Sequence, residues 1–226
     1  MPDRRREPRG ALHREDGTAV VAALNSTGLG DDVLQLVGDD LLIAVAQHVN
    51  GATTLAAACA EGLRRRGWDG DDLLADQLAA TLGLGPVPML RRLPVDLDEL
   101  SDVLEGDPVH GGGRVDRHTG EVRHASIIDY GRETGEEDDA VTKDPDRWVW
   151  VDSQGSRDSY RDMETLTGTV NDRTQARRLD AALSGRGPFR WFKNTVAAWP
   201  DELERWYGWS EERRLGRARK WLADAG

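Results

Sequence analysis

The sequence predicts an α+β fold, in which an N-terminal helical domain is followed by a small antiparallel sheet packed against C-terminal helices. Three observations predict it. Apolar residues recur at helical spacing over residues 18–83. The segment WVWV (148–151), which follows a predicted hairpin and an acidic loop, has the aromatic and β-branched composition of a strand. Helical spacing then returns over residues 156–222.

We expect four segments along the chain: a disordered tail over residues 1–17, a helical domain over 18–83, a linker over 84–93 and an α+β domain over 94–226. The linker prediction rests on prolines and glycines, which interrupt any helical pattern there. Five arginines in the tail would suit an arm that binds nucleic acid, but four acidic residues dilute their charge.

Acidic residues mark predicted helix starts in the first domain. Asp39 and Asp40 are expected to form the N-cap of a helix over residues 41–49, because short acidic side chains accept hydrogen bonds from first-turn amides. Residues 69–72 are expected to open another helix. Cys59 lies on an alanine-rich helical stripe and is predicted to be buried.

The second domain is predicted to begin with a helix capped by Asp96 and to continue with a β-hairpin over residues 114–128. The hairpin is expected to turn at His118-Thr119-Gly120, where glycine supplies a positive φ. Residues 132–146 contain seven acidic residues, whose mutual repulsion predicts a solvated loop.

Trp148 and Trp150 are expected to point to the same side of the third strand, because side chains alternate along a strand. We expect that side to pack against Phe189, Phe192 and Trp206.

Caps and prolines divide the C-terminal helices. Asp172 is expected to cap one helix, Pro188 to occupy the first turn of the next, and Pro200 to end it. Ser210 is expected to cap a separate last helix, with the two following glutamates in its first turn, where acidic groups favour the helix dipole.

Charge is distributed unevenly along the chain. The net charge is −11, and residues 173–226 hold twelve Lys and Arg against seven Asp and Glu, a balance of +5 that leaves −16 for residues 1–172. Repulsion between phosphates and the acidic majority argues against non-specific nucleic-acid binding by the whole surface. A local basic face near the C-terminus remains compatible with this charge.

No membrane association is expected. The most apolar run, residues 41–49, is too short to cross a bilayer, and no apolar stretch follows the N-terminal arginines as it would in a secretory signal. Cys59 is the single cysteine, so an internal disulfide is impossible and a cytoplasmic location is predicted.

Five segments in a fixed order carry a resemblance to a known family: PVDLDELSDVLEG (94–106), RVDRHTGEV (114–122), SRDSYRDMETL (156–166), LSGRGPFRWFK (183–193) and ELERWYGWSEERRLGRARKWLADAG (202–226). With this order and spacing, residues 93–226 resemble the bacterial uncharacterised protein family 0158 (UPF0158). The helical segment before them resembles an N-terminal extension of the actinobacterial type. The resemblance implies a shared fold and carries over no activity, cofactor or catalytic residue.

Basic and aromatic side chains near the C-terminus form the candidate binding site: Arg186, Arg190, Trp191, Lys193, Trp209, Arg214 and Arg217. Flanking glycines place Arg186 at an exposed corner, where a guanidinium can hold an anion bidentately or stack on a ring. The alternative, which the acidic excess favours, is that Arg186 pairs with the protein's own carboxylates.

No catalytic residue, metal or cofactor is predicted. His110, Asp116, His118 and His124 are residue types that bind zinc, but their spacing matches no closed ligand set, and exposed residues beside a turn are the simpler interpretation. The acidic residues serve as caps or lie in the loop, so they lack the rigid pairing of catalytic carboxylates. The sequence also has no nucleophile elbow and no phosphate-binding loop.

The leading hypothesis is a non-enzymatic protein that binds another macromolecule, in the first place another protein. One alternative is a nucleic-acid-binding or regulatory protein that uses the basic C-terminal helices, and another is an enzyme of an unrecognised type. A contiguous positive face across Arg186, Arg190, Arg214 and Arg217 would favour nucleic acid, whereas pairing of these arginines with carboxylates would argue against it.

Overall fold

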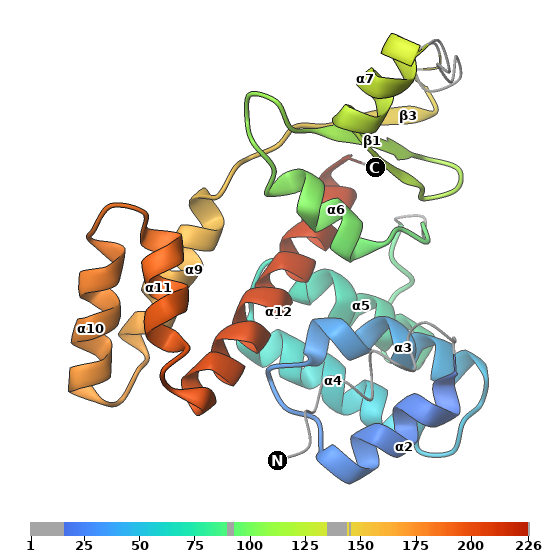
Figure 1. The fold of residues 1–226 in the computed structure, drawn as a ribbon. Helices are drawn as coiled ribbons and strands as arrows, with labels where there is room; N and C mark the ends of the chain where they lie inside the picture. The colour runs from blue at the N-terminus through green and yellow to red at the C-terminus, as the bar shows by residue number, and fades with distance from the viewer. Residues whose placement is uncertain (1–15, 90–92, 135–143, 145, 226) are drawn as a thin grey trace. The chain divides into compact units, whose positions relative to one another are not determined.

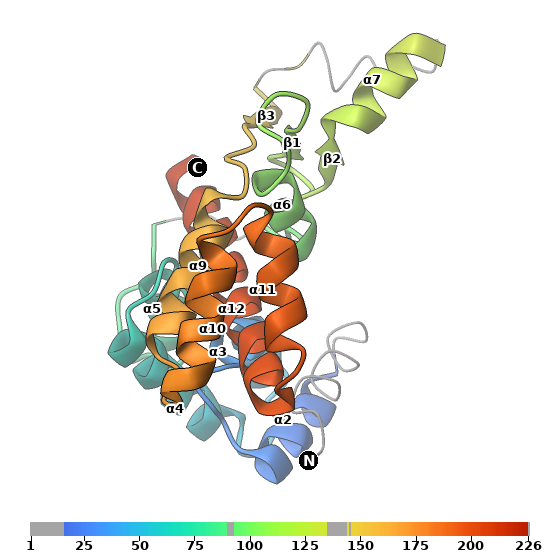
Figure 2. The ribbon, with the colours of Figure 1, turned by 60° about the vertical axis from the view of Figure 1, so that its left-hand side comes forward.

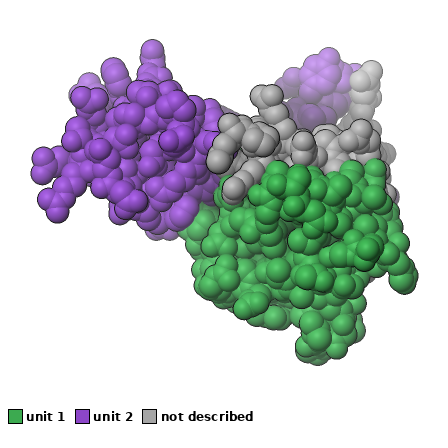
Figure 3. Space-filling model, turned by 90° about the horizontal axis from the view of Figure 1, so that it is seen from below, with its two compact units in different colours: residues 1–91, 212–226 green, residues 92–211 purple. Residues whose placement is uncertain are grey.

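The computed structural model describes residues 16–89, 93–134, 144 and 146–225, which form helices and one three-stranded antiparallel sheet (Figure 1). The α+β prediction is confirmed. The chain divides into two compact units, Met1–Arg91 with Glu212–Gly226, and Arg92–Glu211 (Figure 3). The sequence places the last fifteen residues in the second domain instead, and the predicted domain bounds stay a prediction.

The first unit is built from helices. They are α2 (Gly17–Thr27), α3 (Leu34–Ala46), α4 (Ala52–Arg66), α5 (Asp71–Thr81) and the last turns of α12 (Pro200–Ala225). Leucines and valines of α2 to α5 pack around Cys59, which is buried as predicted. Burial raises the pKa of the Cys59 thiol to about 12, so the side chain stays protonated and serves as a small apolar group.

Two helix starts in the first unit follow local capping rules. The Asp16 side chain accepts hydrogen bonds from the amides of Thr18 and Ala19, both at 3.1 Å, and so begins α2. The rest of the predicted tail, residues 1–15, lies outside the described residues. Helix α5 begins at Asp71, inside the acidic segment that predicted it.

Helix α3 departs from its prediction. It begins at Leu34, so Asp39 and Asp40 lie inside the helix, and the prediction that they cap a helix over residues 41–49 is wrong. Asp39 instead pairs with Arg219, 180 residues later in the chain, at 2.7 Å. A cap prediction considers only neighbouring amides, so it could not detect a partner so distant in sequence.

A small sheet belongs to the second unit. Strand β1 (Gly113–Asp116) lies between β2 (Val122–His124) and β3 (Trp148–Val151) and is antiparallel to both. Asp116 stabilises the predicted turn, because its side chain accepts a hydrogen bond from the His118 amide at 2.7 Å, and Gly120 has the expected positive φ of 82°. Helix α6 (Leu97–Leu104), capped by Asp96 as predicted, contacts β2.

The hairpin ends earlier than predicted. Helix α7 (Ala125–Thr134) follows β2 directly, so the predicted extension of the hairpin to residue 128 is wrong, and so is a loop that starts at residue 132. The remainder of the predicted acidic loop lies outside the described residues, apart from residues 144 and 146.

Three helices of the second unit, α9 (Arg157–Gly168), α10 (Arg173–Leu183) and α11 (Pro188–Val196), lie side by side and share a core with the start of α12 (Figure 2). Phe192 and Trp206 meet edge-to-face in that core, with ring centroids 4.9 Å apart. Asp172 caps α10 through the amides of the next turn, and Pro188 occupies the first turn of α11, as predicted.

The predicted packing of the strand tryptophans is wrong. Neither Trp148 nor Trp150 belongs to the aromatic core of the helices. Trp148 is buried with the guanidinium groups of Arg123 and Arg147 at 5.2 and 5.7 Å from its ring, and Trp150 is 46% exposed. Alternation along the strand predicted their shared side correctly but not that arginines would cover Trp148.

Helix α12 runs without a break from Pro200 to Ala225, so the prediction of a separate last helix capped by Ser210 is wrong. The Ser210 hydroxyl donates to the carbonyl of Tyr207 at 3.2 Å, a bond that a serine inside a helix can make. The helix passes from the second unit to the first between Glu211 and Glu212.

Two glycines of the first unit permit a close backbone approach. A Cβ atom at Gly216, inside α12, would lie 2.1 Å from the carbonyl oxygen of Asp69, and a Cβ atom at Gly70 would lie 2.3 Å from the carbonyl oxygen of Gly216. Both contacts are with backbone, which cannot turn away as a side chain can. Any side chain at Gly216 would therefore force α12 from the segment before α5.

We predict that Gly216→Ala lowers the free energy of unfolding by ~2 kcal/mol, because overpacking outweighs the higher helix propensity of alanine. The matched control is Gly168→Ala at the end of α9, where an added Cβ meets nothing within 4 Å. Urea unfolding followed by circular dichroism measures both. Equal effects of the two substitutions would contradict the close approach.

Candidate functional site

Glu212 of α12 caps a different helix. The N-cap residue of α3 is Val33, whose side chain accepts no hydrogen bond. Two atoms of Glu212 take over that role: Oε2 accepts from the Gln35 amide at 2.7 Å and Oε1 from the Leu36 amide at 3.0 Å. These are first-turn amides without a partner inside α3, and the negative charge also favours the positive end of the helix dipole.

Arg66, the last residue of α4, neutralises this buried carboxylate. Its Nη1 donates to Glu212 at 2.8 Å, while Nη2 and Nε form a bidentate pair with Asp71 at 2.7 and 2.9 Å. The three side chains are 5%, 1% and 0% exposed for Arg66, Glu212 and Asp71. Burial raises the pKa of Glu212, and the charge of Arg66 opposes that rise.

Gln35 and Arg219 extend the same cluster. Gln35 Nε2 donates to Asp71 at 2.9 Å, and Gln35 Oε1 accepts from Arg219 Nε at 3.0 Å. Arg219 also holds Asp39. We call Gln35, Asp39, Arg66, Asp71, Glu212 and Arg219 the capping cluster. Its polar atoms bond one another, the first-turn amides of α3, the Trp68 amide and the Asp31 carbonyl, so its role is to hold the end of α12 among the N-terminal helices.

Asp40 is a buried carboxyl outside the capping cluster. It is 2% exposed, and its Oδ2 has no hydrogen-bond partner within the described part of the chain. Burial, and then the charge of neighbouring Asp39, raise the pKa of Asp40 to about 7. Neutral pH therefore lies close to the point at which this side chain becomes charged.

Exposed cations are concentrated on α10, α11 and the corner between them. Residues 173–198 contain a single acidic residue, Asp180, and six cations. We call this segment the basic hairpin, and its cations are Arg173, Arg177, Arg178, Arg186, Arg190 and Lys193. All six are exposed, so a chain of net charge −11 presents a local balance of +5 here.

The six cations are unpaired within the residues that the structure describes. None of their side chains makes an ion pair, a hydrogen bond or a ring contact there. Elsewhere in the described ranges, Lys and Arg residues interact with other groups, with Arg157 at the start of α9 as the exception. The interpretation in which Arg186 pairs with the protein's own carboxylates is therefore wrong for the described residues.

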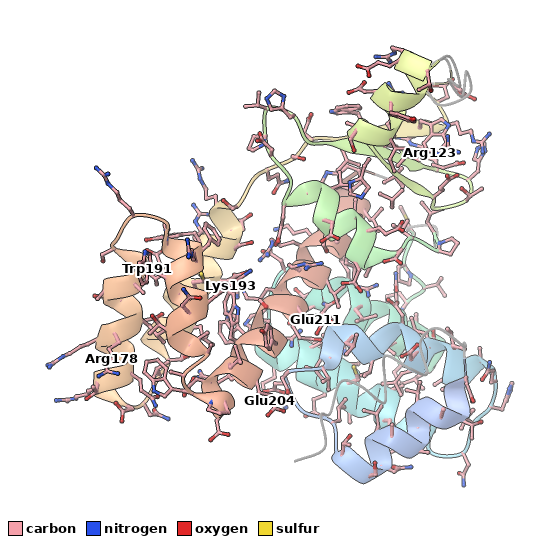
Figure 4. All side chains as sticks on the ribbon, viewed as in Figure 1. Arg123, Arg178, Trp191, Lys193, Glu204 and Glu211 are labelled. Atoms are coloured by element: carbon pink, nitrogen blue, oxygen red, sulfur yellow. The ribbon has the colours of Figure 1, made fainter. Side chains whose placement is uncertain are left out.

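Trp191 stands among these cations and is 57% exposed. Figure 4 shows Arg178 on α10 and Trp191 and Lys193 on α11. Phe192, the next residue, is fully buried, and Gly187 forms the corner before α11 with a φ of 70° that a side chain would disfavour. The buried phenylalanine fixes the rotation of α11 and so turns Trp191 outward.

The remaining predicted site residues lie elsewhere. Trp209 is half-buried and packs against the core of the α9–α12 helices. Arg214 and Arg217 belong to the first unit, are half-buried and already interact with other groups of the protein. The structure thus brings Arg186, Arg190, Trp191 and Lys193 together on the basic hairpin.

Sequence reasoning missed the three cations of α10, Arg173, Arg177 and Arg178. A charge count over 173–198 alone, with six cations against one acid, would have found them. The balance over residues 173–226 is the same +5, because six cations and six acidic residues cancel over 199–226, so that longer count does not show that the whole excess lies in 173–198.

The residues considered for a metal serve other purposes or lie apart. Asp116 accepts two hydrogen bonds from Arg147, at 2.6 and 3.0 Å, which hold the pKa of Asp116 well below its usual range. Among the described residues, no group of three or more His, Cys, Asp or Glu side chains is placed to hold a metal ion. A search of the same residues finds no helix with the length and apolar character to cross a bilayer.

Comparisons with known proteins match the C-terminal part of the chain. Residues 88–226 match the model of an uncharacterised protein family, UPF0158. The chain is similar to a UPF0158 protein of Pseudomonas aeruginosa, 27% identical over 135 residues that cover 60% of this chain and 85% of that protein. No solved structure matches.

We predict that Glu212→Gln lowers the free energy of unfolding by ~3 kcal/mol. The side-chain NH₂ of glutamine is a donor, and it would face either the Arg66 guanidinium or a first-turn amide of α3, which are donors too. The substitution would also remove the negative charge that pairs with buried Arg66. The control is Glu211→Gln, one residue earlier and half-exposed, with an expected change below ~1 kcal/mol. Urea unfolding measures both variants. Similar losses of unfolding free energy would contradict the role of Glu212 as the cap of α3.

We predict that Asp40→Asn stabilises the protein in a pH-dependent way. The pKa of Asp40 is about 7 in the folded protein and 3.8 ordinarily, so above pH 7 the folded state holds a buried charge that the substitution removes. The gain in unfolding free energy is ~2 kcal/mol or more near pH 8 and disappears as the pH falls through 7 towards 4. The free energy of unfolding is measured by denaturation at several pH values, with the exposed Asp72→Asn variant as the control. If Asp40→Asn changed that free energy by the same amount at every pH, the raised pKa of Asp40 would be refuted.

Proposed function

Since the chain belongs to the uncharacterised protein family UPF0158, whose name assigns no activity, we propose a function from its own side chains: it is a non-enzymatic module that binds another protein through the basic hairpin. The observation that carries this proposal is the set of six exposed, unpaired cations on the same helical hairpin as the exposed Trp191. We place the module in the cytoplasm, because its single thiol is buried and reduced.

The cations do not stabilise the hairpin that carries them. Arg173 and Arg177 are four residues apart on α10, and Arg190 and Lys193 are three residues apart on α11, so each pair brings like charges together on one helix face. Their repulsion lowers the stability of both helices. A negatively charged partner would remove that repulsion, which makes binding the better explanation for the pattern.

A protein partner suits the surface better than nucleic acid does. Arginine and tryptophan are the residue types that dominate binding energy at protein interfaces, and here they adjoin on one helix. The nucleic-acid alternative needed Arg214 and Arg217 as part of a continuous positive face, but both already interact with other groups of the protein. That alternative therefore rests on the hairpin alone.

Site-specific photocrosslinking in living cells tests the proposal on the full chain. A photoreactive residue replaces Asn194, which is exposed and three residues from Trp191 on the same helix. The control position is Glu164, exposed on α9. We expect a discrete, nuclease-resistant protein adduct from position 194 only, reduced about tenfold when Arg186 and Arg190 are both replaced by alanine.

Three results would count against this function. Adducts of equal intensity from both positions would show non-specific proximity. A protein adduct that the double arginine variant leaves unchanged would exclude the hairpin as the binding surface. Nuclease-sensitive adducts would favour the nucleic-acid alternative.

A further inference from the structure

We infer that the partner presents an acidic amphipathic helix to the basic hairpin, with carboxylates against the cations and an apolar edge against Trp191. This inference rests on the proposed function and specifies the chemistry of the partner. It follows from how two kinds of side chain are separated on the exposed side of α11.

The buried side of α11 fixes the rotation of the helix. Phe192 and Val196 are fully buried four residues apart, and Phe189 packs against the same core. At 100° per residue, this inner stripe leaves the opposite half of α11 facing solvent. Arg190, Trp191 and the residues one turn beyond them occupy that half.

Charged and apolar groups form two adjacent strips on the exposed half of α11. Arg190 and Lys193 lie on one edge, because they are separated by 60° around the helix axis on the side away from Trp191. Trp191 and Thr195 lie on the other edge, four residues apart. The Thr195 hydroxyl donates to the Trp191 carbonyl at 2.8 Å, so its hydrogen-bonding capacity is used inside the helix.

The apolar strip is narrow next to Trp191. The next residues along this edge are small: Thr195 is half-buried, and Ala198, which lies just beyond the end of α11, is exposed. A single stripe of apolar side chains on a partner helix has the width to pack beside one aromatic ring and small neighbours. Such a helix would bring its polar flank over Arg190 and Lys193.

The cations determine the charge of that flank. Five of the six cations of the basic hairpin are arginines, whose planar guanidinium groups bind carboxylates through two parallel hydrogen bonds. Asp180 is the single acid within residues 173–198, so little in the hairpin competes for them. Acidic residues on the partner therefore supply both attraction and orientation.

Binding of designed peptides to the full-length protein tests this inference. The main probe is a fluorescein-labelled helical peptide of about 15 residues, with leucines along one face and glutamates elsewhere. A second probe has the same composition with leucines spread around the helix, a third replaces glutamate by glutamine, and a fourth is a single-stranded DNA oligomer. Fluorescence anisotropy is recorded at about 0.15 M salt, where weak non-specific attraction is screened.

We expect the acidic amphipathic peptide to bind at least tenfold more tightly than each of the other three probes. Trp191→Ala should weaken binding of the acidic amphipathic peptide about tenfold. It should leave the affinity of the spread-leucine peptide unchanged, because only a continuous apolar edge reaches the indole. Replacing Arg186, Arg190 and Lys193 by glutamine should weaken it by a similar factor.

The matched control replaces three exposed cations outside the hairpin, Arg64, Arg65 and Arg132, by glutamine, and should leave the affinity unchanged. An equal effect of both triple variants would reduce the binding to net charge and overturn the inference. So would failure of the acidic peptide to bind, equal binding of the glutamine peptide, or tighter binding of the DNA.

The two proposals fail in distinguishable ways. If the crosslink from position 194 persists but no acidic probe binds, the protein-binding function stands and the acidic partner is rejected. If position 194 gives no discrete protein adduct while Arg186 and Arg190 are intact, both are rejected.

Discussion

The buried carboxylate of Glu212 is the interaction on which the first unit depends. It satisfies the first-turn amides of α3, which has no cap of its own, and it meets Arg66, which in turn grips Asp71 at the start of α5. One side chain of α12 therefore joins the ends of three other helices. Glu212 lies within the stretch that matches the family, whereas its partners precede that stretch, so this carboxylate joins the family-matching part of the chain to the helices before it.

Charge follows opposite rules in the capping cluster and in the basic hairpin. In the cluster, every buried charge has a partner at hydrogen-bond distance, as burial requires. In the basic hairpin, exposed cations have no partners in the described residues. Because they are solvated, this costs little free energy, but it adds no stability either. The contrast separates what holds the protein together from what is available to bind.

Local rules predicted the parts of the fold that local interactions decide. Caps at Asp96 and Asp172 and the strand WVWV were correct, because each depends on residues within a turn or on alternation. Glu212 was misread as a first-turn acid because its true partners are more than 140 residues away. For the basic hairpin, composition identified Trp191 and three cations, Arg186, Arg190 and Lys193. The structure was needed to show that the three cations have no partners in the described residues.

Amide hydrogen exchange at Gln35 and Leu36 tests most directly the claim that Glu212 caps α3. First-turn amides of a helix without a cap are open to water and exchange rapidly. If Glu212 holds them, both amides should exchange as slowly as those of Leu41 and Leu42 in the middle of α3, and they should become fast in Glu212→Ala while the middle of the helix remains protected. Rapid exchange of Gln35 and Leu36 in the unmodified protein would contradict the account.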